Sequence, residues 1–152
     1  MKAPSIEITA GRPEDGPAIA VLLREAGLPH EDIGPHLGHF LVAREGGGAV
    51  VGAIGAEIHA RDALLRSLVV APSQRGAGLG GDLLRRMEVE ATAWGVKRWW
   101  LLTTTAEKFF RARGFVVADR AAAPVAIRGT RQFTGGCSAG AVCLGRERWS
   151  GH

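Results

Sequence analysis

The chain has 152 residues, of which 46% are hydrophobic and 22% are charged, which provides a core for one domain and excludes an intrinsically disordered chain. The net charge of +4 comes mostly from scattered arginines, whereas a nucleic-acid surface concentrates its basic residues. The N-terminal residues contain no apolar leader, and no apolar run approaches the ~18 residues that a membrane span needs. We therefore expect a single domain, 1–152, in the cytoplasm, with no nucleic-acid or membrane partner.

The first half of the chain predicts a strand, a helix and a series of hairpin strands. Residues 5–10 alternate in polarity like a strand, and apolar residues recur at helical spacing between Pro13 and Gly27. Residues 29–40 predict a short, irregular helical segment. Because turn residues separate the next three apolar runs, we expect an antiparallel meander of strands. These runs are 39–45, 49–60 and 64–72.

The second half predicts a crossover helix, a strand, a short helix and a tail. Apolar residues recur at helical spacing over 83–94, and this helix links the strand at 64–72 to another at 96–105. We therefore expect these two strands to be parallel neighbours joined by a right-handed crossover. A short helix follows and ends at Gly114. The tail, 115–148, predicts two last strands around a loop.

Four glycines stand between the strand at 64–72 and the crossover helix: Gly76, Gly78, Gly80 and Gly81. Because glycine has no Cβ, an anion can approach the unpaired N–H groups at a helix start, so 75–81 predicts a pyrophosphate-binding turn. A flexible turn without a ligand is the alternative. Asp82 excludes a Walker loop, which needs Lys-Ser/Thr there. Gly76, Gly78 and Gly81 fit the dinucleotide-binding pattern G-x-G-x-x-G. However, no ribose-binding acid follows about 20 residues later, so we do not expect a dinucleotide site.

The turn and a second segment resemble the acetyl-CoA-binding segments of the GNAT acyltransferase superfamily. Arg75, Gly78 and Gly80 fit that superfamily's pattern Arg/Gln-x-x-Gly-x-Gly/Ala, and residues 103–115 are similar to its N-x-x-A-x-x-F-Y-x-x-x-G-F segment. The resemblance covers the chain from about residue 5 to residue 146. It implies a GNAT-like α/β (α+β) fold, with a mixed, mostly antiparallel central sheet of about six or seven strands flanked by three or four helices.

The resemblance also implies an N-acetyltransferase that uses acetyl-CoA as co-substrate and no metal. In the superfamily, a tyrosine on the short helix often protonates the leaving thiolate. The matching position here is Phe110, and the chain has no tyrosine, so we expect the thiolate to leave without a side-chain acid. The residues that match the superfamily's donor contacts are Leu68, Val69, Val70, Arg75, Gly76, Ala77, Gly78, Leu79, Gly80, Gly81, Thr103 and Phe110.

Two closer resemblances concern the acceptor. Residues 63–72, 101–115 and 123–141 are similar to the N-acetyltransferases encoded in bacterial arsenic-resistance operons, although those relatives often read Cys-Pro-x-Ser-Ala near Cys137. The segment "LLTT" resembles amino-acid N-acetyltransferases of the acetylglutamate-synthase type. Both imply acetylation of the α-amino group of an amino acid or of an arsenic- or phosphinate-containing, amino-acid-like toxin. A protein N-terminal or polyamine acetyltransferase and a catalytically degenerate CoA-binding module are the alternatives.

Polar residues within apolar strands are the candidates for catalysis and acceptor binding. Glu57 lies near the end of a strand, where a carboxylate is costly unless it is paired or functional, and it is our candidate general base. His59 has the same alternation parity, so it is expected beside Glu57 as a proton relay or substrate contact. Arg66 is expected to pair with Glu57 or to bind a substrate carboxylate, and the two roles can coexist. Thr104 and Thr105 either line the acceptor site or cap the next helix.

The remaining candidates are two tryptophans and two cysteines. Trp99 and Trp100 lie in the middle of a strand and predict a core or dimer-interface role, with stacking on the acceptor as the alternative. A homodimer therefore remains possible. Cys137 and Cys143 are expected to be reduced thiols, and we also consider them as ligands of trivalent arsenic. Their spacing alone does not make a zinc site. The expected partner is a small-molecule amine.

Overall fold

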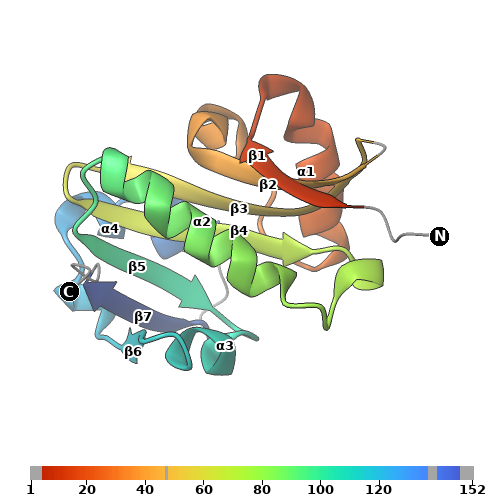
Figure 1. The fold of residues 1–152 in the computed structure, drawn as a ribbon. Coiled ribbons are helices and arrows are strands. Elements are labelled where there is room, and N and C mark those ends of the chain that lie inside the picture. The colour runs from red at the N-terminus through yellow and green to blue at the C-terminus, as the bar shows by residue number, and fades with distance from the viewer. Residues whose placement is uncertain (1–4, 47, 137–139, 148–152) are drawn as a thin grey trace. The chain divides into compact units, whose positions relative to one another are not determined.

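The computed structural model describes residues 5–46, 48–136 and 140–147 (Figure 1). Seven described strands join in one sheet in the order β1-β2-β3-β4-β5-β7-β6. The described chain divides into two compact units. Unit 1 combines the residues up to Ala56 with Ser67–Glu90, and unit 2 combines Glu57–Arg66 with the residues from Ala91 onward. The predicted mixed, mostly antiparallel sheet with flanking helices is confirmed.

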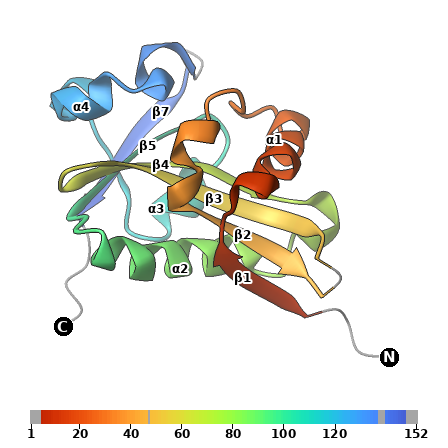
Figure 2. The ribbon, with the colours of Figure 1, turned by 90° about the horizontal axis from the view of Figure 1, so that it is seen from above.

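Unit 1 contains an antiparallel set of strands between two helices. Figure 2 shows helix α1 on one face of β1–β3 and helix α2 on the opposite face. The elements are β1 (Ile6–Ala10), the 3-10 turn Pro13–Asp15, α1 (Gly16–Glu25), the 3-10 segment Gly34–His39, β2 (Phe40–Glu45), the first part of β3 (Val50–His59), the end of β4 (Asp62–Val70), the 3-10 turn Pro72–Gln74 and most of α2 (Leu79–Ala93).

The core of unit 1 forms where α1 meets the sheet. Ile19 and Leu23 of α1 are fully buried and pack with Phe40 and Val42 of β2 and with Ala53 of β3. Their i, i+4 spacing places the two helix residues on one face. On the other face of β3, a Cβ at Gly52 would lie 3.2 Å from Leu83 Cδ1, so a glycine there lets α2 pack closely.

Unit 2 is built around strand β5, which Figure 1 shows beside β7, with β6 beyond β7. β5 pairs in parallel with β4, where Leu64 faces Trp100, and antiparallel with β7, where Leu102 faces Cys143. The parallel pairing predicted across the crossover helix is therefore confirmed. The elements of this unit that follow α2 are β5 (Arg98–Thr103), α3 (Glu107–Arg111), β6 (Val116–Val117), α4 (Val125–Arg128) and β7 (Val142–Glu147).

The core of unit 2 contains both tryptophans of β5. Trp99 is fully buried and Trp100 is 5% exposed, and the indole Nε1 of Trp100 donates a hydrogen bond to Asp62 Oδ1 at 2.9 Å. The core role predicted for these residues is confirmed. Cys143 is 4% exposed and packs with Trp100 and Ile127, and burial raises the pKa of its thiol. Cys137 lies outside the described residues.

The prediction for the tail was wrong in one respect. Two strands, β6 and β7, were expected around a loop, but the segment between them contains helix α4 and two short helical turns. Ile127 of α4 is fully buried against the core of unit 2, which explains why this segment orders as a helix. Within the described part of the chain, no helix has the length and apolar character needed to cross a membrane.

A partly buried ion pair in unit 1 joins Asp15 and Arg44. Asp15 accepts hydrogen bonds from Arg44 Nη2 at 2.5 Å and from the Arg12 N–H at 2.8 Å. The hydrogen bond from Arg44 lowers the pKa of Asp15 below its ordinary value of 3.8. This stabilisation is therefore complete above the unfolded pKa and is lost as the pH falls through the lower folded value.

We expect Asp15→Asn to lower the free energy of unfolding by about 2 kcal/mol at about pH 7, because Arg44 loses its charged partner. Urea unfolding of both proteins at about pH 7 and about pH 3 checks this. The difference should shrink in acid, because the unfolded chain binds the proton already near its ordinary pKa of 3.8, before the folded carboxyl does. A difference that stays constant between the two pH values would contradict the assignment.

Candidate functional site

The glycine turn connects β4 to α2 in unit 1. Gly76 and Gly78 have φ angles of 84° and 83°, a left-handed conformation that side chains with a Cβ rarely adopt. An added Cβ at either position would meet no atom within 4 Å, so the backbone conformation and not the space requires glycine. Gly80 and Gly81 lie in the first turn of α2. The turn thus brings an exposed backbone to the N-terminus of a helix, where N–H groups and the dipole favour an anion.

Arg75 fixes the conformation of this turn. Its Nε donates a hydrogen bond to the carbonyl oxygen of Val70 at 3.2 Å, so the side chain folds back onto the end of β4. Arg75, Gly76, Ala77 and Gly78 are all exposed, and Leu79 is the first buried residue of α2. The predicted turn therefore presents its backbone at the surface of unit 1.

β4 contains a backbone feature that the sequence reasoning missed. Ser67 has a φ angle of 61°, a left-handed conformation inside a strand and next to the predicted donor contacts Leu68, Val69 and Val70. For a residue with a side chain this costs about 1–3 kcal/mol, and such strain concentrates at functional sites. Val69 packs into the core of unit 1, whereas Leu68 and Val70 are only partly buried. Serine gives no sequence signal for this conformation.

Three of the candidate side chains come together on the β3–β4 hairpin of unit 2. Arg66 Nη1 donates to Glu57 Oε2 at 2.7 Å, and the side chains of Arg66 and Glu57 are 0% and 6% exposed. Arg66 was expected to pair with Glu57 or to bind a substrate carboxylate, and the structure contains the pairing with Glu57. His59 Nε2 lies 3.9 Å from Glu57 Oε1, which is beyond hydrogen-bond distance. This Nε2 atom is buried and has no hydrogen-bond partner in the described structure.

The second predicted segment connects β5 to α3. The Thr103 hydroxyl accepts a hydrogen bond from the Ala106 N–H at 2.9 Å, so Thr103 orders the start of α3. Thr104 and Thr105 are exposed. Phe110 is 6% exposed, and its ring packs edge-to-face against Phe109 and Phe115, with centroid distances of 5.1 Å and 5.4 Å. Phe110 is therefore part of the packing of unit 2 and offers no acidic proton.

The fold, with its glycine turn, is that of an acetyltransferase domain. Residues 36–117, more than half of the 152 residues, match the family model described as the acetyltransferase (GNAT) domain. The chain therefore belongs to the GNAT acetyltransferase family. The resemblance to this superfamily that the two segments predicted is confirmed.

The chain is similar to part of two amino-acid acetyltransferases. The protein of Ralstonia nicotianae is 49% identical over 51 residues, and that of Azotobacter vinelandii is 45% identical over 51 residues. Each segment makes up 34% of this chain but only 11% and 12% of the two relatives. The matched segment is thus a small part of much longer proteins.

Solved structures have the same fold. N-acetylglutamate synthase from Neisseria gonorrhoeae, solved with coenzyme A and N-acetyl-glutamate, has a TM-score of 0.82 and 25% identity over 97% of this chain and 36% of its own. PaiA N-acetyltransferase from Thermoplasma acidophilum, solved with coenzyme A, has a TM-score of 0.71 and 19% identity over 94% of this chain and 99% of its own. The second likeness concerns the fold alone.

Proposed function

We propose that the chain is an acetyl-CoA-dependent N-acetyltransferase, built as a single domain of residues 1–152. The acceptor we propose is the α-amino group of an amino acid or of an amino-acid-like toxin such as an arsenic- or phosphinate-containing antimetabolite. The observation that carries the proposal is the left-handed glycine turn at Gly76 and Gly78, which opens α2 within the matched acetyltransferase region. The similarity to amino-acid acetyltransferases supports the acceptor class.

The turn residues bind the donor through their backbone. The N–H groups of 75–81 and the start of α2 bind the pyrophosphate of acetyl-CoA, because the glycines allow close approach and the helix dipole favours negative charge. Leu68, Val69, Val70, Thr103 and Phe110 are the further donor contacts we propose. The left-handed backbone at Ser67 lies just before this segment, and backbone strain of this kind is typical of functional sites.

Glu57 is the residue we propose as general base. Acyl transfer needs a neutral amine, and Glu57 accepts the proton that the acceptor's ammonium group must lose. The amine nitrogen then forms the amide bond while the thioester C–S bond breaks and the thiolate leaves, and the second proton of the nitrogen passes to water or to the thiolate. A thiol pKa of about 8.5 makes the thiolate a leaving group without an acid, which is consistent with Phe110. Arg66 holds Glu57 in position at 2.7 Å. His59, whose Nε2 lies 3.9 Å from Glu57 Oε1 without a hydrogen bond, is the further residue we propose, as a substrate contact or as a relay that needs closer approach.

A binding measurement and a transfer assay test this function. Acetyl-CoA, but not NAD or ATP, should raise the melting temperature, and absence of any shift with acetyl-CoA would contradict the proposal. Release of free thiol should then occur with amino acids or their arsenic- and phosphinate-containing analogues. Release only with peptides or polyamines would identify another acetyltransferase, and stabilisation without release for any amine would identify a CoA-binding module.

A matched pair of glycine variants tests the role of the turn. We expect Gly78→Ala to weaken acetyl-CoA binding about fivefold to tenfold, because an alanine in the left-handed region costs about 1–2 kcal/mol. Gly34→Ala is the control, since Gly34 is exposed and a Cβ there meets no atom within 4 Å. Isothermal titration of both variants gives the dissociation constants. Equal affinities would show that the turn conformation does not matter for the donor.

A further inference from the structure

One edge of the sheet in unit 1 is formed by β1. This strand pairs antiparallel with β2, and among the described residues no strand pairs with its other side. Figure 2 shows β1 and β3 on opposite sides of β2. β1 has five residues, whereas β6, at the other end of the strand order, has two. A short edge strand limits pairing with other chains, so β1 is the edge better suited to accept a further strand.

The outer side of β1 presents backbone hydrogen-bonding groups. The N–H of Gly11 donates to the carbonyl oxygen of Phe40 at 2.7 Å, and this bond continues the register of β1 with β2. Because the N–H and C=O groups of successive residues alternate in direction, those of the odd-numbered residues face β2. The backbone groups of Ile6, Ile8 and Ala10 therefore point outward, where they can form hydrogen bonds with a second strand.

A second copy of β1 fits this edge best in one antiparallel register. Each hydrogen-bonded pair needs two outward-facing residues opposite each other, so even-numbered residues must lie opposite even-numbered ones. A pairing centred on Ile8 uses all the outward-facing residues of both copies. A pairing centred on Glu7 places two carboxylates opposite each other, which is destabilising, and one centred on Thr9 leaves Ile6 beyond the end of the opposite strand. The register centred on Ile8 is therefore favoured.

One face of the paired strands is apolar in this register. Ile6, Ile8 and Ala10 share a face of β1, because successive side chains alternate between the two faces. Ile8 lies opposite Ile8 of the second copy, and Ile6 lies opposite Ala10. Ile6 is 36% exposed in the single chain, so the pairing removes apolar surface from water.

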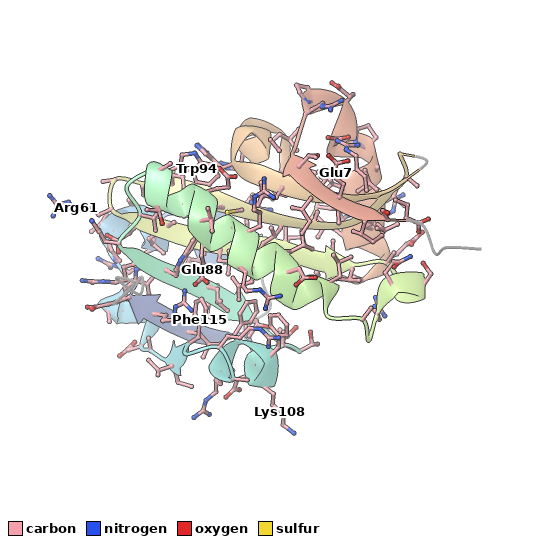
Figure 3. All side chains as sticks on the ribbon, viewed as in Figure 1. Glu7, Arg61, Glu88, Trp94, Lys108 and Phe115 are labelled. Carbon is pink, nitrogen blue, oxygen red and sulfur yellow. The ribbon has the colours of Figure 1, made fainter. Side chains whose placement is uncertain are left out.

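The other face brings a carboxylate to hydrogen-bond donors. Glu7, which Figure 3 labels on β1, is exposed and lies opposite Thr9 of the second copy. Within each chain, Thr9 Oγ1 accepts a hydrogen bond from Arg44 Nε at 3.4 Å. The hydroxyl proton of Thr9 can therefore be donated to the carboxylate of Glu7, with the charge of Arg44 beside it. This complementarity favours a second copy of the chain over an unrelated strand.

We propose that β1 is a homodimerisation surface, on which two copies of this chain pair antiparallel around Ile8. A two-fold axis passes through the pairing at Ile8, so the surface is complementary to itself. All the residues that carry this inference lie in unit 1. The interface uses neither the glycine turn nor Glu57, so its test is independent of the proposed acetyl transfer.

A proline at the centre of the pairing tests the surface. Sedimentation velocity over a range of protein concentrations should show a dimer for wild type. Ile8→Pro should raise the dissociation constant of the dimer at least about tenfold, because it removes the outward N–H of each copy. The fold should tolerate this proline, since that N–H makes no bond to β2. A wild-type chain that stays monomeric at all concentrations would overturn the proposal.

Val117→Pro is the matched control on the other edge strand. The N–H of Ala118 donates to the carbonyl oxygen of Cys143 in β7 at 2.9 Å, so by alternation the N–H of Val117 points away from β7. This variant removes an outward N–H from β6 and should leave the dissociation constant unchanged. Equal effects of the two prolines, or no effect of Ile8→Pro, would place the dimer contact elsewhere and overturn the assignment to β1.

A charge exchange tests the register. Thr9→Glu places two carboxylates opposite each other and should weaken the dimer about fivefold, and Glu7→Lys should weaken it by a similar factor. The double variant should recover the wild-type dissociation constant, because each new lysine lies opposite a new glutamate of the second copy. Registers centred on Glu7 or on Thr9 would place like charges opposite each other instead. A double variant that dimerises no better than the single ones would therefore contradict the pairing around Ile8.

Hydrogen exchange gives a measurement on the unmodified chain. The amides of Ile6, Ile8 and Ala10 should exchange more slowly at concentrations at which the dimer forms, whereas the amide of Thr9, which faces β2, should be protected at every concentration. A dimer in which the three outward amides gain no protection would overturn the proposal. So would a monomer in which they gain protection only when an unrelated protein binds, because the edge would then belong to another partner.

Discussion

Glu57→Gln is expected to lower kcat/KM for acetyl transfer by about 10²–10⁴-fold, which is the usual contribution of a positioned general base. Glutamine keeps the shape of the side chain but cannot accept the proton of the acceptor. The wild-type rate should fall in acid because the acceptor amine is protonated there. The variant should be slower than wild type over the whole pH range, because it lacks the proton acceptor. Initial rates of thiol release between about pH 6 and pH 9 measure both effects.

The same substitution also disturbs a buried ion pair, so stability must be measured together with activity. Arg66 is fully buried beside Glu57, and removing one partner of such a pair costs about 3–5 kcal/mol. The double variant Glu57→Gln/Arg66→Met removes both charges and should recover much of this loss. If Glu57 is the base, the double variant is stable and inactive. If Glu57 serves only the fold, its activity returns together with its stability.

The parts of this protein that the sequence predicted are those that depend on local chemistry. The glycine turn at 75–81 was predictable because the left-handed angles of Gly76 and Gly78 are set by the residue type and the adjoining helix. The strands and the crossover helix were predictable because each carries several turns or alternations of one apolar pattern. The family was predictable because the glycine turn and residues 103–115 both resemble segments of the acetyltransferase superfamily and occur in the same order and at the same distance.

The parts that sequence reasoning missed or left open depend on tertiary contacts. Helix α4 has four residues, which is too short for a helical period to appear, and only Ile127 is buried as its anchor. Ser67 adopts a left-handed angle without the glycine or asparagine that would indicate it. The pairing of Glu57 with Arg66 depends on the register of the β3–β4 hairpin. Strand parity alone did not decide between this pairing and a contact with a substrate carboxylate, two roles that can coexist.

Gly55→Ala is expected to lower the free energy of unfolding by about 3 kcal/mol, a large effect for one methyl group. Gly55 lies directly opposite Phe40 in the β2–β3 pairing, and the ring of Phe40 covers it. A Cβ at Gly55 would lie 2.4 Å from Cε1 and Cζ of that ring, which is far inside van der Waals contact. Phe40 is 1% exposed and packs against Ile19 and Leu23, so the ring cannot swing away without disturbing the core. Urea unfolding gives the value.

A double-mutant cycle separates this steric cause from the general effect of replacing a glycine. Gly38→Ala is the control, because a Cβ there meets no atom within 4 Å, and it should change stability by less than about 1 kcal/mol. Phe40→Leu shortens the side chain that the new methyl group would strike, so the double variant with Gly55→Ala should be more stable than the sum of the single effects by at least about 1 kcal/mol. Strict additivity would mean that Phe40 does not lie over Gly55, and the packing of β2 against β3 in unit 1 would then need another explanation.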